Sequence, residues 1–248
     1  MEAALTIIRY KKRFIFFAFQ TMLIFRIPLL LNKNISFFKL LGTSRKGRFL
    51  MKPDWQQWGI ITVRNKAFEG NKCKTKQLND PANYLLIREI YGPFIAAWFR
   101  LFNCETFTVL AEPLTGHGTW DGKQAFGELP VHAAHDGMIA ILTRASIRLN
   151  KVRLFWKQVA PVEEEFKNAK GLLTSFGMGE LPFIKQATFS VWENEDCMKT
   201  FAYGMKGHRE AIENSKKHKW FSEEMYIRFR ITGSFGTNRG IQPLDQKL

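Results

Sequence analysis

The feature that most constrains the fold of this chain is a pattern that occurs twice along its 248 residues. FTVLAEPLTGHGTWDG, residues 107–122, and YIRFRITGSFGTNRG, residues 226–240, both alternate apolar and polar residues, reach Thr-Gly, turn, and continue as Gly-Thr to a final Gly. Alternation with a period of two is typical of β-strands, and the glycines mark turns. The repeat therefore predicts a chain built from two similar halves.

Each half also contains matching strands before this repeat. They pair GIITVRN (residues 59–65) with ATFSVWEN (187–194), and ALTIIRY (4–10) with MIAILTRASIR (138–148). A long apolar and aromatic helix is predicted after each opening strand, over residues 14–31 and 151–168. Each half thus has the order β-α-β-β-α-β of a ferredoxin-like unit, in which two helices cover one face of an antiparallel sheet.

The predicted fold class is α+β, with two ferredoxin-like β-α-β-β-α-β units in tandem that pack as an α/β barrel. We expect the N-terminal unit at residues 1–122, a Gly-rich linker at 123–137, and the C-terminal unit at 138–248. Gly177 and Gly179 of SFGMGEL are predicted to form a turn between strands, because no third glycine and no following helix complete a nucleotide-binding pattern.

The chain is strongly basic, with 37 Lys and Arg against 22 Asp and Glu and a formal charge of +15. Such an excess favours anionic partners. The sequence has no helix-turn-helix, zinc-finger or RNP pattern and its basic residues are dispersed, so nucleic acid is not the expected partner. An ordinary solvated surface and a contact with an anionic membrane both remain open.

Residues 14–31, FIFFAFQTMLIFRIPLLL, form the only stretch apolar enough to consider as a membrane span. Gln20 and Arg26 lie inside it, and Pro28 would kink it. No small-residue cleavage site of a signal peptide follows. A helix that is buried, or that faces a membrane from one side, is therefore favoured over a true span.

Few motifs in the sequence indicate covalent or metal chemistry. Cys73, Cys104 and Cys197 lie far apart, without the spacing of a zinc site or a disulfide framework, and are predicted to be free thiols in a reducing cytoplasm. His132 and His135 have an H-x-x-H spacing, but no third ligand lies within the range of a motif. The sequence has no G-x-S-x-G, P-loop or H-E-x-x-H pattern.

FAYGMKGHREAI, residues 201–212, places one histidine in a helix that is predicted to begin at the cap Asn194 and to continue through the following lysines. Helical spacing puts His208 on the apolar side of this helix, whereas the opposite side is charged. Gly204 and Gly207 each cost a helix about 1 kcal/mol relative to Ala. Their presence indicates either that another group approaches the backbone closely or that the helix breaks here.

From the residues alone, His208 has two interpretations. It is either a core histidine hydrogen-bonded to a carbonyl group, or an axial ligand of a flat cofactor such as haem, whose iron can take a single histidine. A lone histidine outside any motif does not separate these two roles.

Several stretches in order along residues 5–240 resemble the spheroidene monooxygenase family. They are FFKLLGTS (37–44), GTWDG (118–122), ILTRASIR (141–148), FGMGELPFIKQATFSVW (176–192), FAYGMKGHREAI (201–212) and WFSEEMYIRFR (220–230). The family comprises bacterial carotenoid ketolases, which insert oxygen at an activated methylene of an acyclic carotenoid and are understood to contain haem. Its implied fold is the dimeric α/β-barrel type, here with both ferredoxin-like units in one chain.

The resemblance implies site residues as well as a fold. Haem proteins built on paired ferredoxin-like units take the axial histidine from a helix of the C-terminal unit, which makes His208 the expected ligand of a haem iron. Arg144 and Arg148, on the opening strand of the second half, are candidate partners of the haem propionates, and Lys39 is a third.

The function implied by the resemblance is haem-dependent oxygen insertion, by hydroxylation or ketolation, into a hydrophobic carotenoid-like substrate. The expected partners are this small molecule, O₂ and an electron donor. We expect the protein in the cytoplasm, with peripheral contact at the inner face of the membrane and a homo-oligomer as open options. Two alternatives also stay open: a haem-binding protein without oxygenase activity, and a non-catalytic α/β-barrel module in which His208 is a core residue.

Overall fold

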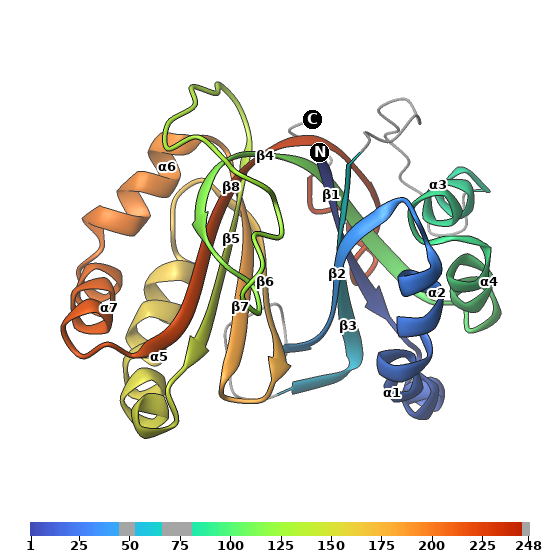
Figure 1. The fold of residues 1–248 in the computed structure, drawn as a ribbon, viewed down its shortest axis with the longest axis horizontal. Coiled ribbons are helices and arrows are strands. Elements are labelled where there is room, and N and C mark those ends of the chain that lie inside the picture. Colours follow the sequence, from blue (N-terminus) through green and yellow to red (C-terminus); the bar gives the residue numbers. More distant parts are fainter. Residues whose placement is uncertain (45–52, 66–80, 245–248) are drawn as a thin grey trace. The chain divides into compact units, whose positions relative to one another are not determined.

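The computed structural model describes residues 1–44, 53–65 and 81–244, and the chain divides into two compact units (Figure 1). Unit 1 comprises Met1–Thr43, Asp54–Pro113 and Ile231–Leu248, and unit 2 comprises Ser44–Pro53 and Leu114–Arg230. This division differs from the expected boundaries, because residues 114–137 belong to unit 2 and residues 231–248 belong to unit 1. The reason is the length of two strands, β4 (Glu105–Gly118) and β8 (Phe221–Gly236), each of which contributes to both units.

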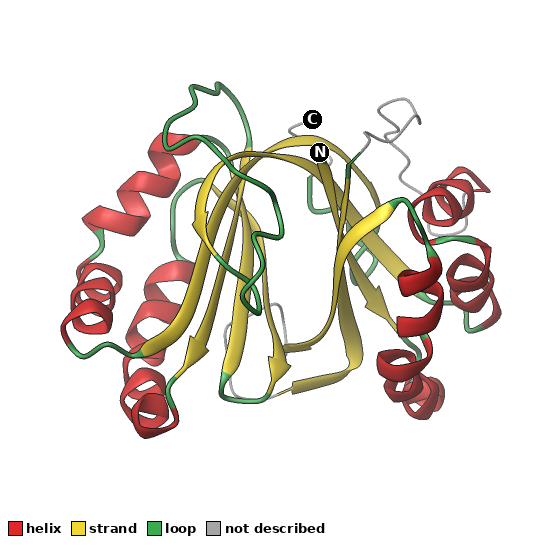
Figure 2. Cartoon of the chain, viewed as in Figure 1, coloured by secondary structure: helices red, strands yellow, loops and turns green. Residues whose placement is uncertain are grey.

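Unit 1 is a ferredoxin-like unit in which the helices cover one face of a four-stranded sheet (Figure 2). Besides β4, its elements are β1 (Glu2–Arg9), α1 (Ile15–Ile24), α2 (Arg26–Leu31), β2 (Ile35–Ser44), β3 (Pro53–Arg64), α3 (Pro81–Tyr91) and α4 (Pro93–Leu101). The strand order is β4-β1-β3-β2. β1 is central and antiparallel to both neighbours, so that Thr6 pairs with Ile60 on one side and with Thr108 on the other.

Unit 2 repeats this arrangement. Besides β8, its elements are β5 (Ile139–Ile147), α5 (Val152–Lys167), β6 (Leu172–Leu181), β7 (Lys185–Trp192), α6 (Glu195–Lys199) and α7 (Lys206–Lys217). The strand order is β8-β5-β7-β6, and β5 is antiparallel to both neighbours. The predicted α+β class and the tandem of two ferredoxin-like units are confirmed.

The turn predicted at Gly177 and Gly179 needs correction. Gly177 and Gly179 do not form a turn but lie within β6, opposite Thr188 and Gln186 of β7. A Cβ on Gly179 would lie 2.8 Å from the carbonyl oxygen of Lys185, so the close approach of β7 explains a glycine inside the strand.

The helix predicted over residues 14–31 is divided into α1 and α2 at Phe25. The ring of a proline meets the carbonyl group four residues earlier, and for Pro28 that residue is Ile24, the last of α1. The kink expected from Pro28 therefore lies three residues before it.

The repeated Gly-Thr-x-x-Gly segments form the same structure in both units, which we call the clasp. In unit 2, one carboxylate oxygen of Glu223 accepts hydrogen bonds from Thr119 Oγ1 and from the backbone N–H of Gly122, both at 2.7 Å. In unit 1, Glu105 accepts from Thr237 Oγ1 at 2.9 Å and from the N–H of Gly240 at 2.6 Å. Each clasp thus ties the turn after a long strand to the start of the other long strand in its unit.

The first glycine of each clasp is required by its backbone and its surroundings. Gly118 and Gly236 have positive φ angles of 89° and 80°. A Cβ would lie 2.1 Å from the carbonyl oxygen of Glu224 in one case and 2.0 Å from that of Thr106 in the other. No side chain fits there, which explains why the sequence repeat keeps glycine at this position.

Candidate functional site

The segment around His208 is an interrupted helix rather than the continuous one predicted. The cap is as expected, because Asn194 Oδ1 accepts a hydrogen bond of 2.9 Å from the N–H of Cys197 at the start of α6. α6 then widens into a π-helical turn over Thr200–Gly204, and Met205 is extended with φ −81° and ψ 127°. α7 begins at the next residue. The helix therefore breaks here, as one of the two interpretations of Gly204 and Gly207 predicts.

The other interpretation of the glycines, the close approach of another group to the backbone, is confirmed at Gly207. Glu165 of α5 accepts hydrogen bonds from the backbone N–H groups of Gly207 at 2.9 Å and of His208 at 3.1 Å. A Cβ on Gly207 would lie 3.0 Å from both carboxylate oxygens, so a larger residue would push this carboxylate away. A carboxylate at a helix N-terminus satisfies N–H groups that have no partner within the helix. Glu165 therefore fixes the start of α7 and the backbone of His208.

The imidazole of His208 has a defined orientation. Its Nδ1 lies 2.9 Å from the carbonyl oxygen of Ala202, and its ring lies against Phe201, with the ring centroids 4.7 Å apart. A carbonyl only accepts, so Nδ1 carries the proton and Nε2 keeps its lone pair. Burial lowers the pKa of His208, although the Ala202 carbonyl and the charge of Glu165 act in the opposite direction. The neutral ring is the form that binds a metal ion.

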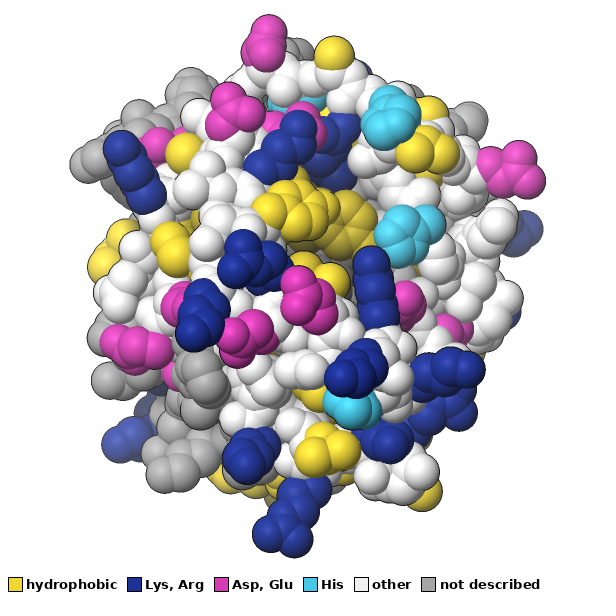
Figure 3. All heavy atoms as spheres, turned by 90° about the vertical axis from the view of Figure 1, so that its left-hand side faces the viewer, with side chains coloured by type: hydrophobic (Ala, Val, Ile, Leu, Met, Phe, Trp, Pro, Cys, Tyr) yellow, Lys and Arg dark blue, Asp and Glu magenta, His cyan; other side chains and the backbone are white. Residues whose placement is uncertain are grey.

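An apolar cluster lies under this segment, on the face of the unit 2 sheet that the helices cover. Its buried members are Ile139, Ile141, Ala169, Trp192, Met198 and Phe201. The Phe201 ring lies 5.4 Å from that of Trp192 and 5.1 Å from that of Phe166. On this side of the molecule, Figure 3 shows apolar side chains inside a hollow, with basic, acidic and His side chains around it.

The helices leave part of this sheet face uncovered. Thr143 lies in the central strand β5, two residues after Ile141 and thus on the same face, yet it is exposed. Its neighbour across the strands is Tyr226, which is partly buried. The central strand of a ferredoxin-like sheet is normally covered, so an exposed residue here marks an opening between sheet and helices.

Tyr226 places a polar group at this opening. Its hydroxyl lies 3.9 Å from Met198 Sδ, and its ring stacks on His117 with the centroids 5.9 Å apart. Burial raises the pKa of Tyr226 to about 12, so the hydroxyl keeps its proton at neutral pH. No sequence pattern distinguishes Tyr226, although it lies in the stretch WFSEEMYIRFR that carries part of the family resemblance.

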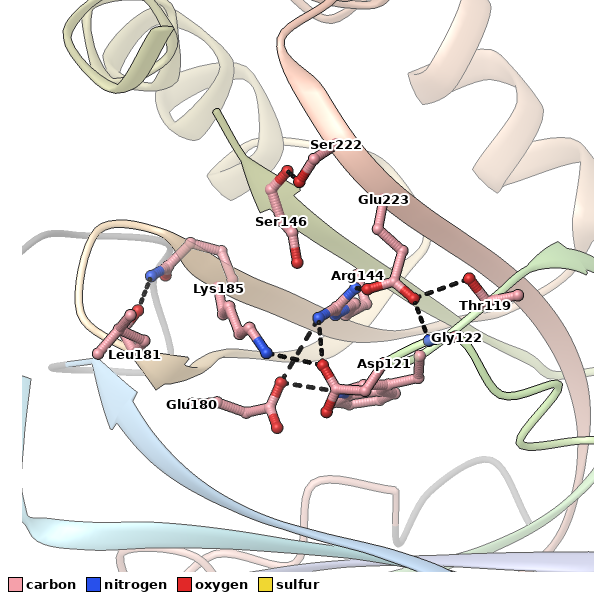
Figure 4. A network of polar contacts seen from close by, with 12 residues as sticks. Thr119, Asp121, Gly122, Arg144, Ser146, Glu180, Leu181, Lys185, Ser222 and Glu223 are labelled. Carbon is pink, nitrogen blue, oxygen red and sulfur yellow. Dashed lines mark hydrogen bonds and ion pairs between the residues drawn. The ribbon is translucent and has the colours of Figure 1, made fainter. Parts of the chain in front are cut away.

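Arg144 lies on the other face of the sheet from His208. It is three residues from Ile141 along β5, and an odd spacing in a strand points a side chain to the opposite face. Its side chain is 1% exposed, and its guanidinium pairs with Glu223, with Asp121 at 3.3 Å and with Glu180 at 3.7 Å (Figure 4). The structure therefore does not bring Arg144 and His208 together.

This Arg144 network belongs to the clasp of unit 2. Burial alone would raise the pKa of Glu223, but the hydrogen bonds from Gly122 and Thr119 and the charge of Arg144 together lower it. Trp120, within the GTWDG motif, donates from Nε1 to Glu180 at 2.8 Å. The carboxylates around Arg144 were not foreseen, because they come from three separate stretches of the sequence.

The two other expected cations have local contacts of their own. Arg148 is exposed and donates from Nε to the carbonyl group of Phe221 at 3.2 Å. Lys39 belongs to β2 of unit 1, where its Nζ lies 5.7 Å from the centroid of the Phe37 ring. Their role as propionate partners stays a prediction of the sequence.

Other groups with metal-binding chemistry are scattered. Among the described residues no three His, Cys, Asp or Glu side chains are gathered so that they could hold a metal ion. His135 Nε2 lies 3.2 Å from the carbonyl oxygen of Met138. Cys104 and Cys197 are free thiols, as predicted, and Cys73 lies outside the described residues.

Comparison with known proteins identifies relatives along most of the chain. Spheroidene monooxygenase of Rhodobacter capsulatus is 32% identical over 230 residues, which cover 92% of this chain and 88% of the relative. The enzymes of the same name from Cereibacter sphaeroides and Rubrivivax gelatinosus are 34% and 33% identical, over 86% and 82% of this chain and 60% and 71% of the relatives. No family model matches the chain.

Among solved structures, two of aldoxime dehydratase share the fold. Their TM-scores are 0.60 and 0.58, at 10% and 12% sequence identity, and the match covers 98% of this chain in both cases and 86% and 84% of the dehydratases. At this level of identity the likeness concerns the fold alone.

Proposed function

This chain belongs to the spheroidene monooxygenase family and is therefore a monooxygenase, and we propose that it uses haem, with His208 as the axial ligand, to insert oxygen into an apolar, carotenoid-like substrate. The observation that carries the proposal is the hydrogen bond from His208 Nδ1 to the carbonyl group of Ala202. A backbone acceptor at one ring nitrogen fixes the tautomer and leaves the lone pair of the other nitrogen, Nε2, for the iron that it would hold.

The residues around His208 fit a haem in two further respects. Haem brings four nitrogen ligands of its own, so one histidine from the protein is sufficient to hold its iron. Phe166, Trp192 and Phe201 offer an aromatic wall for an apolar macrocycle. When bound, the haem iron supplies the activation of O₂, and the protein supplies binding, orientation and exclusion of water.

Each side chain near His208 has a definite task in this proposal. Glu165 holds the backbone of His208 in place, and Phe201 limits the rotation of the imidazole ring. The hydroxyl groups of Thr143 and Tyr226 can donate hydrogen bonds to a ligand in the opening, because both carry their protons at neutral pH. Arg144 has no part in the proposal, since three carboxylates already surround its charge.

The family and the apolar site support a proposal for the substrate and the partners. A monooxygenase acts on a small molecule with O₂ and an electron donor, and we propose an acyclic carotenoid-like molecule as the substrate. Such a molecule dissolves in a lipid bilayer rather than in water, so the proposed function includes peripheral contact with a membrane. A haem-binding protein without oxygenase activity remains the second candidate, because the contacts of His208 support the cofactor but do not report on turnover.

An absorption spectrum of the purified protein tests the cofactor. We expect a Soret band after expression with ample haem precursor, loss of that band in His208→Ala, and its recovery when imidazole is added to the variant. His218→Ala is the matched control, because His218 is exposed directly after α7 and should leave the band unchanged. Colourless wild-type protein that takes up no added haem would overturn the proposal.

The activity is tested with the haem-loaded protein, a reductant and an acyclic carotenoid under ¹⁸O₂. We expect a product that carries one labelled oxygen atom per inserted hydroxyl or keto group, as oxygen insertion from O₂ requires. A Soret band without any labelled product would leave the haem-binding candidate as the better description.

A further inference from the structure

We propose that α1 and α2 form a docking surface for an anionic phospholipid bilayer. The surface consists of Phe16, Phe19, Leu23, Ile27 and Leu30, which we call the outer stripe. These residues follow one another at spacings of three or four, so they lie along one side of the two helices. The inference extends the membrane contact of the proposed function, but it is carried by the surface of unit 1 and does not use the activity.

The outer stripe is exposed because the opposite side of the helices provides the packing. Ala18, Thr21, Phe25 and Leu29 form the buried side. The Phe25 ring, for example, lies 5.8 Å from the ring of Trp98 and 5.6 Å from that of Phe99, both in α4. A surface helix normally carries polar residues on its second side, whereas α1 and α2 are apolar on both.

The outer stripe exposes more contiguous apolar surface than single apolar residues scattered over a protein surface do. Its five side chains are between 43% and 72% exposed, and Leu31 beside them is 75% exposed. Large contiguous apolar surfaces of this kind mark contacts with proteins or membranes. Trp55 of β3 continues the surface, with its ring 5.1 Å from that of Phe19, and tryptophan is enriched where proteins meet the lipid–water interface.

Charge decides between a membrane and a protein partner. Lys11, Lys12 and Arg13 precede α1, Arg26 begins α2 and Lys33 follows it, and all five side chains are exposed. The sequence has no Asp or Glu between Glu2 and Asp54. A rim of cations around an apolar centre, in a segment without acidic residues, is complementary to the headgroups and acyl chains of anionic lipids. Two copies of the same surface would instead bring like charges together.

The helices lie on the membrane rather than cross it. Lys12–Leu31 is long and apolar enough for a span, but β1 precedes it and β2 follows it. Both strands are neighbours of β3 in the sheet of unit 1. A crossing would place β1 and β2 on opposite sides of the bilayer and so separate strands that share a partner. The fold of unit 1 therefore requires both ends of the segment on one side.

Binding to vesicles tests the surface with the full-length protein. We expect it to sediment with vesicles of phosphatidylcholine containing about 30% phosphatidylglycerol, and to bind pure phosphatidylcholine at least about tenfold more weakly. Binding to the anionic vesicles should weaken but persist when NaCl is raised from about 0.1 M to about 0.5 M, because salt screens the cationic rim and not the apolar contact.

A pair of matched variants isolates the outer stripe. Leu23→Glu with Ile27→Glu should lower the affinity for the anionic vesicles at least about tenfold, because two charges then enter the apolar contact. Val131→Glu with Leu149→Glu is the control, since both side chains are exposed in unit 2 and the change in charge is the same. Circular dichroism of both variants should match the wild type, because neither pair supports the core.

Several outcomes would overturn the inference. Wild-type protein that does not bind anionic vesicles would refute the inference directly. Equal losses in both variants would mean that total charge, not the outer stripe, governs binding. A second copy of the chain would be the occupant if the wild type binds no vesicles and is a dimer in light scattering, and if Leu23→Glu with Ile27→Glu makes it monomeric. Resistance to alkaline carbonate extraction from cell membranes would indicate a span. None of these results depends on haem or turnover, so they are distinct from failure of the proposed function.

Discussion

Units 1 and 2 have the same strand order and the same clasp, but their sheets are covered differently. In unit 1, every residue of the central strand β1 from Glu2 to Ile8 is buried. In unit 2, the central strand β5 exposes Thr143 on the face toward the helices. In unit 1, α1 and α2 are apolar on both sides, whereas the helices of unit 2 leave an opening beside Tyr226. The strand order and the clasp are thus the same in both units, and the units differ in their helices.

The second helix of each unit makes this contrast specific. Both are interrupted: Gly92, with φ 93°, separates α3 from α4, and the extended Met205 precedes α7. The third residue after the break is Ile95 in unit 1 and His208 in unit 2. Ile95 is fully buried in the core, while His208 is half-buried against Phe201. An apolar core position in one unit thus corresponds to the proposed ligand position in the other.

The largest effect that would sharpen the comparison concerns the two clasps. Glu223→Ala should lower the free energy of unfolding by about 3–5 kcal/mol, because it removes the clasp and also takes a partner from Arg144, which is buried. Glu105→Ala removes the same two hydrogen bonds in unit 1 and should cost about 1–3 kcal/mol. Urea unfolding of both variants measures the difference.

Equal losses in these two variants would contradict this view, because they would show that the Arg144 network adds nothing to the clasp. A larger loss of unfolding free energy in Glu105→Ala would mean that the clasp of unit 1, not that of unit 2, contributes more to stability.

The repeat explains how much of the fold could be predicted from the sequence. Period-two strands ending in Gly-Thr-x-x-Gly located β4 and β8 and led to both ferredoxin-like units. The assignment of residues 231–248 to unit 1 could not be predicted, because it depends on which strands β8 pairs with along its length. The turn predicted at Gly177 and Gly179 rests on the absence of a third glycine and a following helix, but both residues lie in β6, and Gly179 admits the backbone of β7.

The site was predictable only in part, for a similar reason. Helical spacing placed His208 on the apolar side, and the two glycines pointed to a break and a close approach. Glu165, which makes that approach, is one of three consecutive glutamates, and nothing in the sequence distinguishes it. The carboxylates around Arg144 could not be predicted, because Asp121, Glu180 and Glu223 are distant from it in the sequence.

An intermediate effect is expected at the position just before His208. Gly207→Ala should lower the free energy of unfolding by about 1–3 kcal/mol, because its methyl group would displace the Glu165 carboxylate that fixes α7. The corresponding second residue of α4 in unit 1 is Phe94, a large side chain that is half exposed. The measurement is again the urea unfolding curve.

Gly204→Ala is the matched control for this prediction. A Cβ there would have Thr200 Cγ2 as its nearest neighbour, at 3.8 Å, so the change should be neutral or stabilise by up to about 1 kcal/mol. If both alanines are tolerated equally, the contact between α5 and α7 does not hold the start of α7.

The smallest effect is a difference in acid stability between the wild type and Glu223→Gln. The pKa of Glu223 is lowered in the folded protein, so the folded state binds this proton less readily than the unfolded chain does. The stabilisation is therefore complete above the ordinary pKa of a glutamate and is lost as the pH falls through the lowered value. Glu223→Gln keeps an oxygen for Thr119 and Gly122 but cannot titrate, so its unfolding free energy should fall less than that of the wild type between pH 6 and pH 3. Parallel pH profiles of the two proteins would mean that Arg144 is held by Asp121 and Glu180 alone, and that the clasps of the two units differ less in charge than in their surroundings.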